Sequence, residues 1–138
     1  MKSILFSIPF LLILACSPEP QTPSTIISRT LIQTSKSWNG SPLPAYPRGV
    51  PEISILRITI PAGARLPLHT HPCINAGILL KGQLTVTTKQ KKVLHLKAGD
   101  PIVEVVDTWH EGINPGKVPA IIVVFYAGTK GKAITIKK

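Results

Sequence analysis

Short apolar segments, each closed by Gly, Pro, Asn or Asp, recur from about residue 28 to the end of the chain. No window sustains the three- to four-residue spacing of apolar side chains that marks an amphipathic helix. Short segments rich in Ile, Val, Leu and Thr, with turn residues between them, are typical of β-strands. The pattern therefore predicts an all-β domain, either a sandwich or a barrel.

The clearest strand pattern lies in the segment that ends at Ile60. Every second residue from Leu56 to Ile60 is a large aliphatic one, with a charged and a hydroxyl side chain between them, which indicates a strand with one buried face. A Pro- and Gly-rich loop precedes it, and the aromatic residues Trp38 and Tyr46 lead us to expect a packed lid there. The expected strands are residues 31–34, 53–60, 74–81, 84–88, 93–96, 102–106, 109–113 and 120–126.

The N-terminus predicts export. Lys2 precedes an apolar run over residues 4–14, which fits the hydrophobic region of a secretory signal and is shorter than the ~20 residues that span a bilayer. The run ends in Ala15-Cys16, which resembles the lipobox of bacterial lipoproteins, in which the cysteine is lipidated. We expect a lipoprotein signal peptide over residues 1–15, a lipidated Cys16 and Pro-rich tether over residues 16–27, and the folded domain over residues 28–138.

Lipidation would place the domain outside the cytoplasm, because the acyl chains hold it at a membrane surface. Ser17 after the cysteine is similar to the context of outer-membrane sorting, so the expected location is the outer membrane or the periplasmic face of a membrane. With Cys16 acylated, Cys73 has no partner for an intramolecular disulfide.

The formal charge of +10 does not predict a nucleic-acid partner. The charge comes mostly from Lys scattered over turns and the C-terminus, with few aromatic residues between them, which is typical of a solvated surface. We therefore expect a small-molecule ligand and the membrane as partners. A homodimer is an open alternative to a monomer, because small barrels expose edge strands.

Two histidines one residue apart, His69 and His71, are the most informative polar pair in the chain. In an extended backbone they point to the same face, and neutral imidazole is the commonest protein ligand for Zn, Fe, Cu and Ni. Asn75 follows four residues later, where a third side chain could join them. His110 lies about forty residues downstream in a second segment of similar character.

Together these segments resemble the two motifs of the cupin superfamily. The motifs read Gly63-x5-His69-x-His71-x3-Asn75-x6-Gly82 and Gly99-x10-His110-x3-Asn114. The resemblance implies a cupin-type double-stranded β-barrel, or jelly roll, in which His69, His71 and His110 converge on one divalent metal ion. Asn75 stands where metal-binding cupins carry a glutamate ligand, and Val105 and Asp107 stand where the family often has Pro and Gly.

The departure at Asn75 leaves three neutral imidazoles and a weaker amide oxygen as the expected ligand set. Three histidines with water form a known catalytic zinc arrangement and also suit Fe, Cu or Ni, with Mn less favoured because it prefers oxygen. The alternative is a metal-free cupin whose histidines bind a polar ligand or line a wet pocket.

The other candidate residues carry weaker signals. His95 lies between two leucines and is expected on the surface, and Cys73 is expected to be a buried structural thiol. Glu104 is an acid in an apolar run, so it either faces solvent, which we favour, or points into the barrel as a proton acceptor. Trp109 and Tyr126 are expected in the core or the pocket wall.

The sequence therefore favours a cupin-domain lipoprotein that binds a divalent metal and a small molecule. If it is an enzyme, the resemblance implies a metal-dependent dioxygenase or isomerase, and the sequence shows no second catalytic carboxylate. The alternative is a non-catalytic module that binds or senses a small molecule or a metal at the membrane surface.

Replacing the proposed lipid attachment residue tests the anchor directly. The Cys16→Ser variant has no thiol to acylate, so we expect the protein to move from the membrane fraction to the soluble fraction on cell fractionation. A Cys73→Ser variant serves as the control and should stay with the membrane. Membrane retention of Cys16→Ser would indicate a different anchor.

Overall fold

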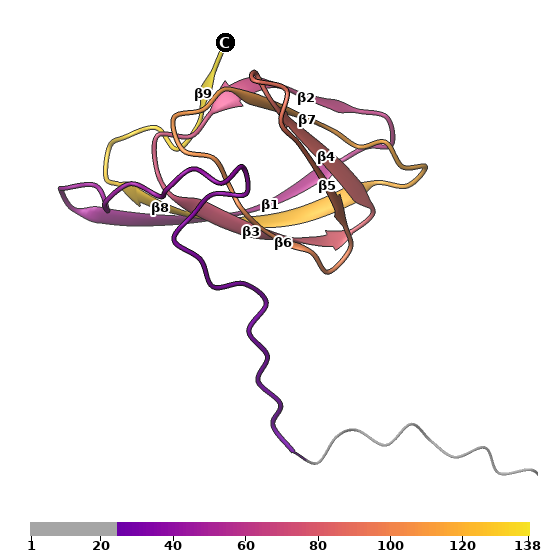
Figure 1. The fold of residues 1–138 in the computed structure, drawn as a ribbon, viewed down its shortest axis with the longest axis horizontal. Helices are drawn as coiled ribbons and strands as arrows, with labels where there is room; N and C mark the ends of the chain where they lie inside the picture. Colours follow the sequence, from indigo (N-terminus) through magenta and orange to yellow (C-terminus); the bar gives the residue numbers. More distant parts are fainter. Residues whose placement is uncertain (1–24) are drawn as a thin grey trace, which may run out of the picture.

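A computed structural model describes residues 25–138, and the predicted signal peptide, Cys16 and most of the tether lie outside these residues. The described chain forms strands and turns, with no helix in this part of the protein (Figure 1). No helix long and apolar enough to cross a membrane occurs among these residues. The strands are β1 (Pro51–Ile60), β2 (Arg65–Thr70), β3 (Asn75–Lys81), β4 (Gln83–Thr88), β5 (Val93–Lys97), β6 (Pro101–Val103), β7 (His110–Ile113), β8 (Ala120–Thr129) and β9 (Ile136–Lys137).

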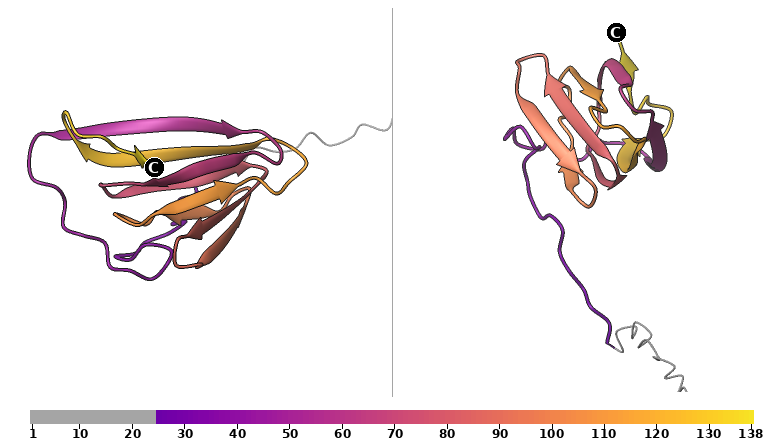
Figure 2. Two further views of the ribbon diagram at one scale, coloured as in Figure 1. Left: turned by 90° about the horizontal axis from the view of Figure 1, so that it is seen from above. Right: turned by 90° about the vertical axis from the view of Figure 1, so that its right-hand side faces the viewer.

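Two antiparallel sheets make up the barrel. One has the strand order β1-β8-β3-β6 and the other the order β5-β4-β7-β2-β9. The long strands β1 and β8 run side by side over ten residues each (Figure 2). Apart from the consecutive pair β4 and β5, neighbours in each sheet are not consecutive in sequence, as in a jelly roll. The predicted all-β fold class is confirmed.

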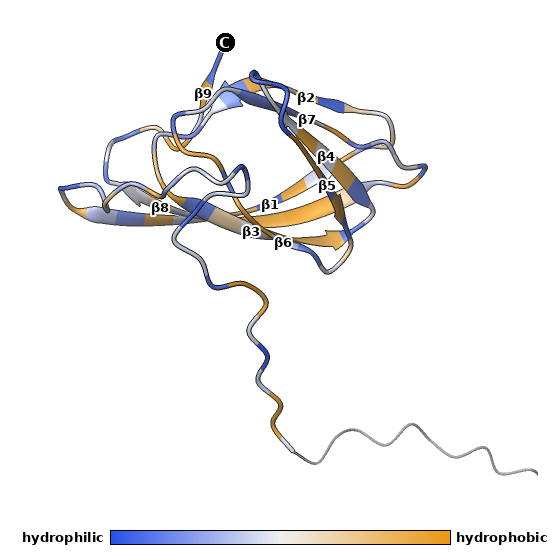
Figure 3. Cartoon of the chain, in the orientation of Figure 1, coloured by the Kyte–Doolittle hydropathy of each residue, from blue (hydrophilic) through white to orange (hydrophobic). Residues whose placement is uncertain are grey.

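The core lies between the sheets and follows the predicted alternation. In β1, the residues from Ser54 to Ile60 that face inward are more buried than those between them, as the period of two requires. The same holds in β8, where Ile122, Val124 and Tyr126 are buried. Figure 3 shows apolar segments on strands of both sheets, with many polar residues at the turns. The sheet that contains β1 and β8 forms the apolar wall behind the site.

Two strand predictions need correction, and two strands were not predicted. Residues 31–34 form no strand, because this exposed segment has no neighbouring strand to pair with. The strand predicted at 102–106 ends at Val103. Its outer edge contacts the N-terminal loop, because Trp38 N donates to Val103 O at 2.9 Å, and on the β3 side one further backbone hydrogen bond joins Glu104 N to Asn75 O. Strand β2 and the short strand β9, which adds to its edge, were not among the predicted strands.

The loop before β1 packs on the barrel at one aromatic residue only. Ser37 is buried and Trp38 packs against the core. Tyr46, in contrast, is 78% exposed. The expected lid is therefore restricted to the segment around Trp38, which covers the end of β6.

Two motif glycines allow a matched test of the fold. Gly63 and Gly82 both have positive φ, 72° and 78°. A Cβ at Gly63 would have nothing within 4 Å, whereas one at Gly82 would lie 2.9 Å from the Ala120 Cα. Left-handed backbone costs a non-glycine residue about 1–2 kcal/mol, so we expect Gly63→Ala to lower the free energy of unfolding by about that amount. Gly82→Ala should cost more in urea unfolding, because the backbone clash adds to the strain, and equal losses would contradict the close approach of β3 and β8.

Candidate metal centre

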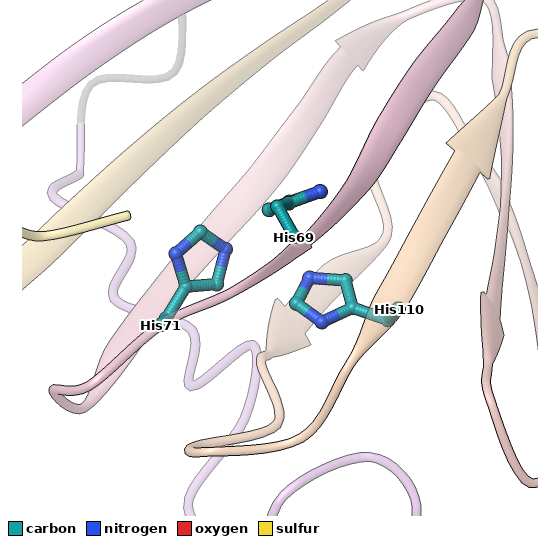
Figure 4. Close-up of side chains that lie close together, drawn as sticks. All are labelled: His69, His71 and His110. Carbon is teal, nitrogen blue, oxygen red and sulfur yellow. The ribbon is translucent and has the colours of Figure 1, made fainter. Parts of the chain in front are cut away.

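Three histidines meet at the mouth of the barrel. His69 lies on β2, His110 begins β7, and His71 follows the end of β2. The three imidazoles point toward one another (Figure 4), and their ligand atoms all lie within 4.8 Å of one another. The structure therefore brings together the three residues that the two motifs single out.

Strand pairing and a turn explain the convergence. His69 and His110 are directly paired across β2 and β7, after a register shift between Leu66 and His69. Cross-strand partners present their side chains on the same face. His71 forms an isolated parallel bridge with Val106, and Asp107 N donates to His71 O at 2.9 Å.

Asp107 preserves the turn at the position where cupins often carry glycine. Its φ is +49°, in the left-handed region that Gly favours and that Asp tolerates better than most residues. The departure from the motif at this position therefore leaves the backbone path toward His110 intact.

Backbone carbonyls fix the tautomer of each ring. The Nδ1 atoms of His69 and His110 lie 2.6 Å from Pro67 O and 2.8 Å from Thr108 O, each two residues earlier in the chain. His71 Nδ1 lies 3.0 Å from Ile134 O. A carbonyl only accepts, so each Nδ1 carries the proton and donates it. In a neutral ring this leaves the lone pair on Nε2, the atom that a metal would use.

Burial keeps the three rings neutral. It lowers the pKa of His69 and of His110 below the ordinary histidine value, against the opposing effect of their backbone hydrogen bonds. Burial lowers the pKa of His71 to about 4, with the neighbouring histidines adding to the shift. The site therefore presents neutral imidazoles near neutral pH, as metal binding requires.

Asn75 lies beside the histidines at the start of β3. It is 1% exposed and its Nδ2 donates to Cys73 O at 3.3 Å. Its Oδ1 and the His110 Nε2 are buried without a hydrogen-bond partner among the described residues. Buried polar atoms are rarely left unpaired, so these two mark a place for a bound group.

Glu104 corrects our prediction, because it faces the barrel rather than solvent. It is 9% exposed and lines the cavity that holds the histidines. Alternation failed here because residues 102–105 are covered on both sides, by the barrel and by the loop around Trp38. Burial raises the pKa of Glu104, while hydrogen bonds from Val105 N and the Trp38 indole act in the opposite direction.

The site has an inner and an outer space. The inner cavity, between the histidines, Asn75 and Glu104, has a volume of about 40 Å³. The outer groove, which shares His69, His71 and Tyr126 with it, has a volume of about 530 Å³. A single water needs roughly 10–15 Å³, and small-molecule sites typically have roughly 300–1,000 Å³. The inner cavity therefore suits an ion, and the groove suits a small molecule.

Of the remaining predicted residues, some line the cavity or the groove and others lie away from both. Tyr126 is buried and lines both spaces, whereas Trp109 is absent from the residues that line them. Cys73 is buried outside the histidine cluster, and burial raises the pKa of its thiol. His95 is exposed and lies 3.0 Å from Thr85 Oγ1 on the outer side of the barrel.

Sequence reasoning missed the C-terminal wall of the groove. Ile134, Thr135 and Lys137 line it, and β9 places Lys137 directly opposite His69 on β2. Alternation of apolar and polar residues over 133–137 was the available signal, although the stretch is short.

The donor set fits a divalent transition metal. Three Nε2 lone pairs turned toward one another, with one of them and an amide oxygen unpaired, form the nitrogen-rich environment that such ions prefer. Two donors that each lie about 2.1 Å from a tetrahedral ion are about 3.4 Å apart, so ligand atoms that lie within 4.8 Å of one another need to close by at most about 1.4 Å.

Fold and site together define a jelly-roll barrel with a histidine cluster between its sheets. The profile of the cupin domain matches residues 56–126, more than half of the chain, and this range contains both motifs. The chain belongs to the cupin family. No curated protein matches it.

Several solved structures share the fold. Oxalate oxidase in complex with the substrate analogue glycolate is 25% identical, with a TM-score of 0.53 over 62% of this chain and 45% of that chain. An uncharacterised protein with a double-stranded β-helix domain from Klebsiella pneumoniae is 22% identical, with a TM-score of 0.54 over 67% of this chain and 90% of that one. Lactobacillus farciminis oxalate decarboxylase in a formate complex is 22% identical, with a TM-score of 0.54 over 62% and 26%. The match spans less than half the length of the oxalate oxidase chain.

The carbonyl contacts predict the tautomer of the histidines. In metal-free protein at neutral pH, we expect His69, His71 and His110 to carry the proton on Nδ1, because each Nδ1 faces a carbonyl oxygen. Long-range ¹H–¹⁵N correlation spectra of the imidazole rings distinguish the two tautomers. A proton on Nε2 of any of the three would contradict the proposed direction of its lone pair.

Proposed function

We propose that this protein binds one divalent transition metal through His69, His71 and His110 and a small molecule in the outer groove. The observation that carries the proposal is the set of three Nδ1–carbonyl contacts, which leave all three Nε2 lone pairs directed at one cavity. Asn75 Oδ1, buried without a partner among residues 25–138, offers a weaker oxygen donor beside them.

The three imidazoles favour Zn, Fe, Cu or Ni over Mn. When bound, such an ion supplies Lewis acidity or, for Fe and Cu, oxygen activation, which supports a metal-dependent oxygenase or isomerase. Carbonyl contacts and burial hold the rings in place and keep them neutral, and the groove offers apolar side chains such as Leu56, Ile58 and Ile134 for contact with a ligand. A catalytic role requires the ligand in the groove to reach the cavity past His69 and His71, which line both spaces.

Small carboxylates are the first ligand class to test. Glycolate and formate are the molecules in the oxalate oxidase and oxalate decarboxylase complexes that share this fold. In this chain Lys137 lies at the groove, where its ammonium group would attract an anionic ligand. The proposed setting is the outer membrane or the periplasmic face of a membrane, with Cys16 as the lipid attachment.

Metal content tests the proposal. We expect protein purified from the periplasm-facing membrane to contain close to one equivalent of a transition metal by mass spectrometry of the metal content. His69→Ala and His110→Ala should each remove most of it, because a three-nitrogen site cannot tolerate the loss of one donor.

A matched control variant distinguishes metal binding at the three histidines from metal binding by a histidine on the surface. His95→Ala removes an exposed imidazole on the outer side of the barrel and should keep the wild-type metal content. Wild-type protein that takes up no metal after exposure to Zn, Fe, Cu and Ni would overturn the proposal, and so would equal losses in all three variants.

A further inference from the structure

The residue beside Asn75 in the sheet is a carboxylate. Strand β6 pairs with β3 through Val103 and Ala76, and the same register continues one step further, because Glu104 N donates to Asn75 O at 3.0 Å. Paired residues of neighbouring strands point to the same face, and both side chains line the inner cavity. Glu104 therefore lies directly across from Asn75, the position where cupins carry a glutamate ligand, on the adjacent strand.

The Glu104 carboxylate is directed at the histidine cluster. Its Oε2 lies 3.8 Å from His110 Nε2, one of the buried atoms without a partner. Adjacent donors on one ion lie about 3.0–3.4 Å apart and opposite donors about 4.2 Å, so a separation of 3.8 Å allows a shared ion after a movement of less than about 1 Å. Among residues 25–138, the hydrogen bonds to this carboxylate, from Trp38 Nε1 at 3.3 Å and Val105 N at 3.2 Å, both end on Oε2, so Oε1 keeps its lone pairs.

A bound cation would offset the cost of burying the Glu104 carboxylate. A buried carboxylate is costly unless a cation or strong donors compensate it, and the His110 ring that faces it at 3.8 Å is neutral and offers no positive charge. A divalent cation held by three neutral imidazoles has no anionic ligand to offset its positive charge. A cavity that contains both the cation and the Glu104 carboxylate lowers the cost of burying each charge.

We infer that Glu104 supplies the carboxylate that the first motif lacks at Asn75, so that the metal site is three histidines and one glutamate delivered from the neighbouring strand. The inference rests on the proposed function and names an additional ligand for the same site. Trp38 is then a positioning residue, because its indole N–H holds Oε2 and orients the carboxylate toward the cavity.

Cobalt(II) titration of metal-free protein tests the inference without any substrate. The absorption bands of Co(II) report affinity and ligand set together. We expect Glu104→Gln, which keeps the shape but removes the charge, to bind Co(II) at least about tenfold more weakly and with an altered spectrum. Glu52→Gln removes an exposed glutamate on β1 and is the charge-matched control, which should bind like the wild type.

Placing the carboxylate at position 75 on β3 instead of position 104 should restore metal affinity. The double variant Asn75→Glu/Glu104→Gln restores a glutamate at the family position, and we expect it to regain most of the lost affinity. Without metal, Glu104→Gln should have an equal or higher melting temperature than the wild type, because the buried charge is gone, and its metal-induced rise in melting temperature should be smaller.

Wild-type affinity and an unchanged spectrum in Glu104→Gln would overturn the inference while leaving the histidine site intact. Absence of Co(II) binding in the wild type would instead overturn the proposed function. If Glu104→Gln does not fold, infrared difference spectra of ¹³C-glutamate-labelled wild type with and without Zn²⁺ decide the question. Glu111 also lines the inner cavity, so a shifted carboxylate band that persists in both Glu52→Gln and Glu111→Gln supports ligation by Glu104, and no shift contradicts it.

Discussion

The pairing of β2 with β7 is the constraint on which the site depends, because it sets His69 directly opposite His110. Neither ring could be placed by its own strand alone. The carbonyl two residues before each histidine then fixes which nitrogen carries the proton. One strand pairing therefore determines both the position and the chemical character of two of the three imidazoles.

Much of the fold and the histidine cluster could be predicted from the sequence, because strand alternation and each histidine motif are local patterns, and the family resemblance implied that the two motifs meet. Alternation from Leu56 to Ile60 indicated a half-buried strand, and the spacing of His69, His71 and His110 matched a family pattern. The structure agrees with the all-β fold and with the meeting of these rings. Such signals need only a few neighbouring residues to be read.

The parts that escaped prediction depend on contacts between distant segments. The inward direction of Glu104 depends on the register of β6 against β3 and on the loop around Trp38, sixty-six residues earlier in the chain. We expected an acidic residue in an apolar segment to face solvent, because we assumed that one face of the strand is exposed. In the structure both faces of this segment are covered. The role of Ile134 at His71 was hidden for the same reason.

The contact between His71 and Ile134 also connects the metal centre to the C-terminal segment. The His71 ring finds its acceptor only when the C-terminal segment has docked, and β9 at the same time covers the open edge of β2. A chain still lacking these residues would have two histidines in register and a third that is free to rotate. The arrangement of the three histidines therefore depends on the docking of the C-terminal segment, and the same docking covers an edge that could otherwise pair with another molecule.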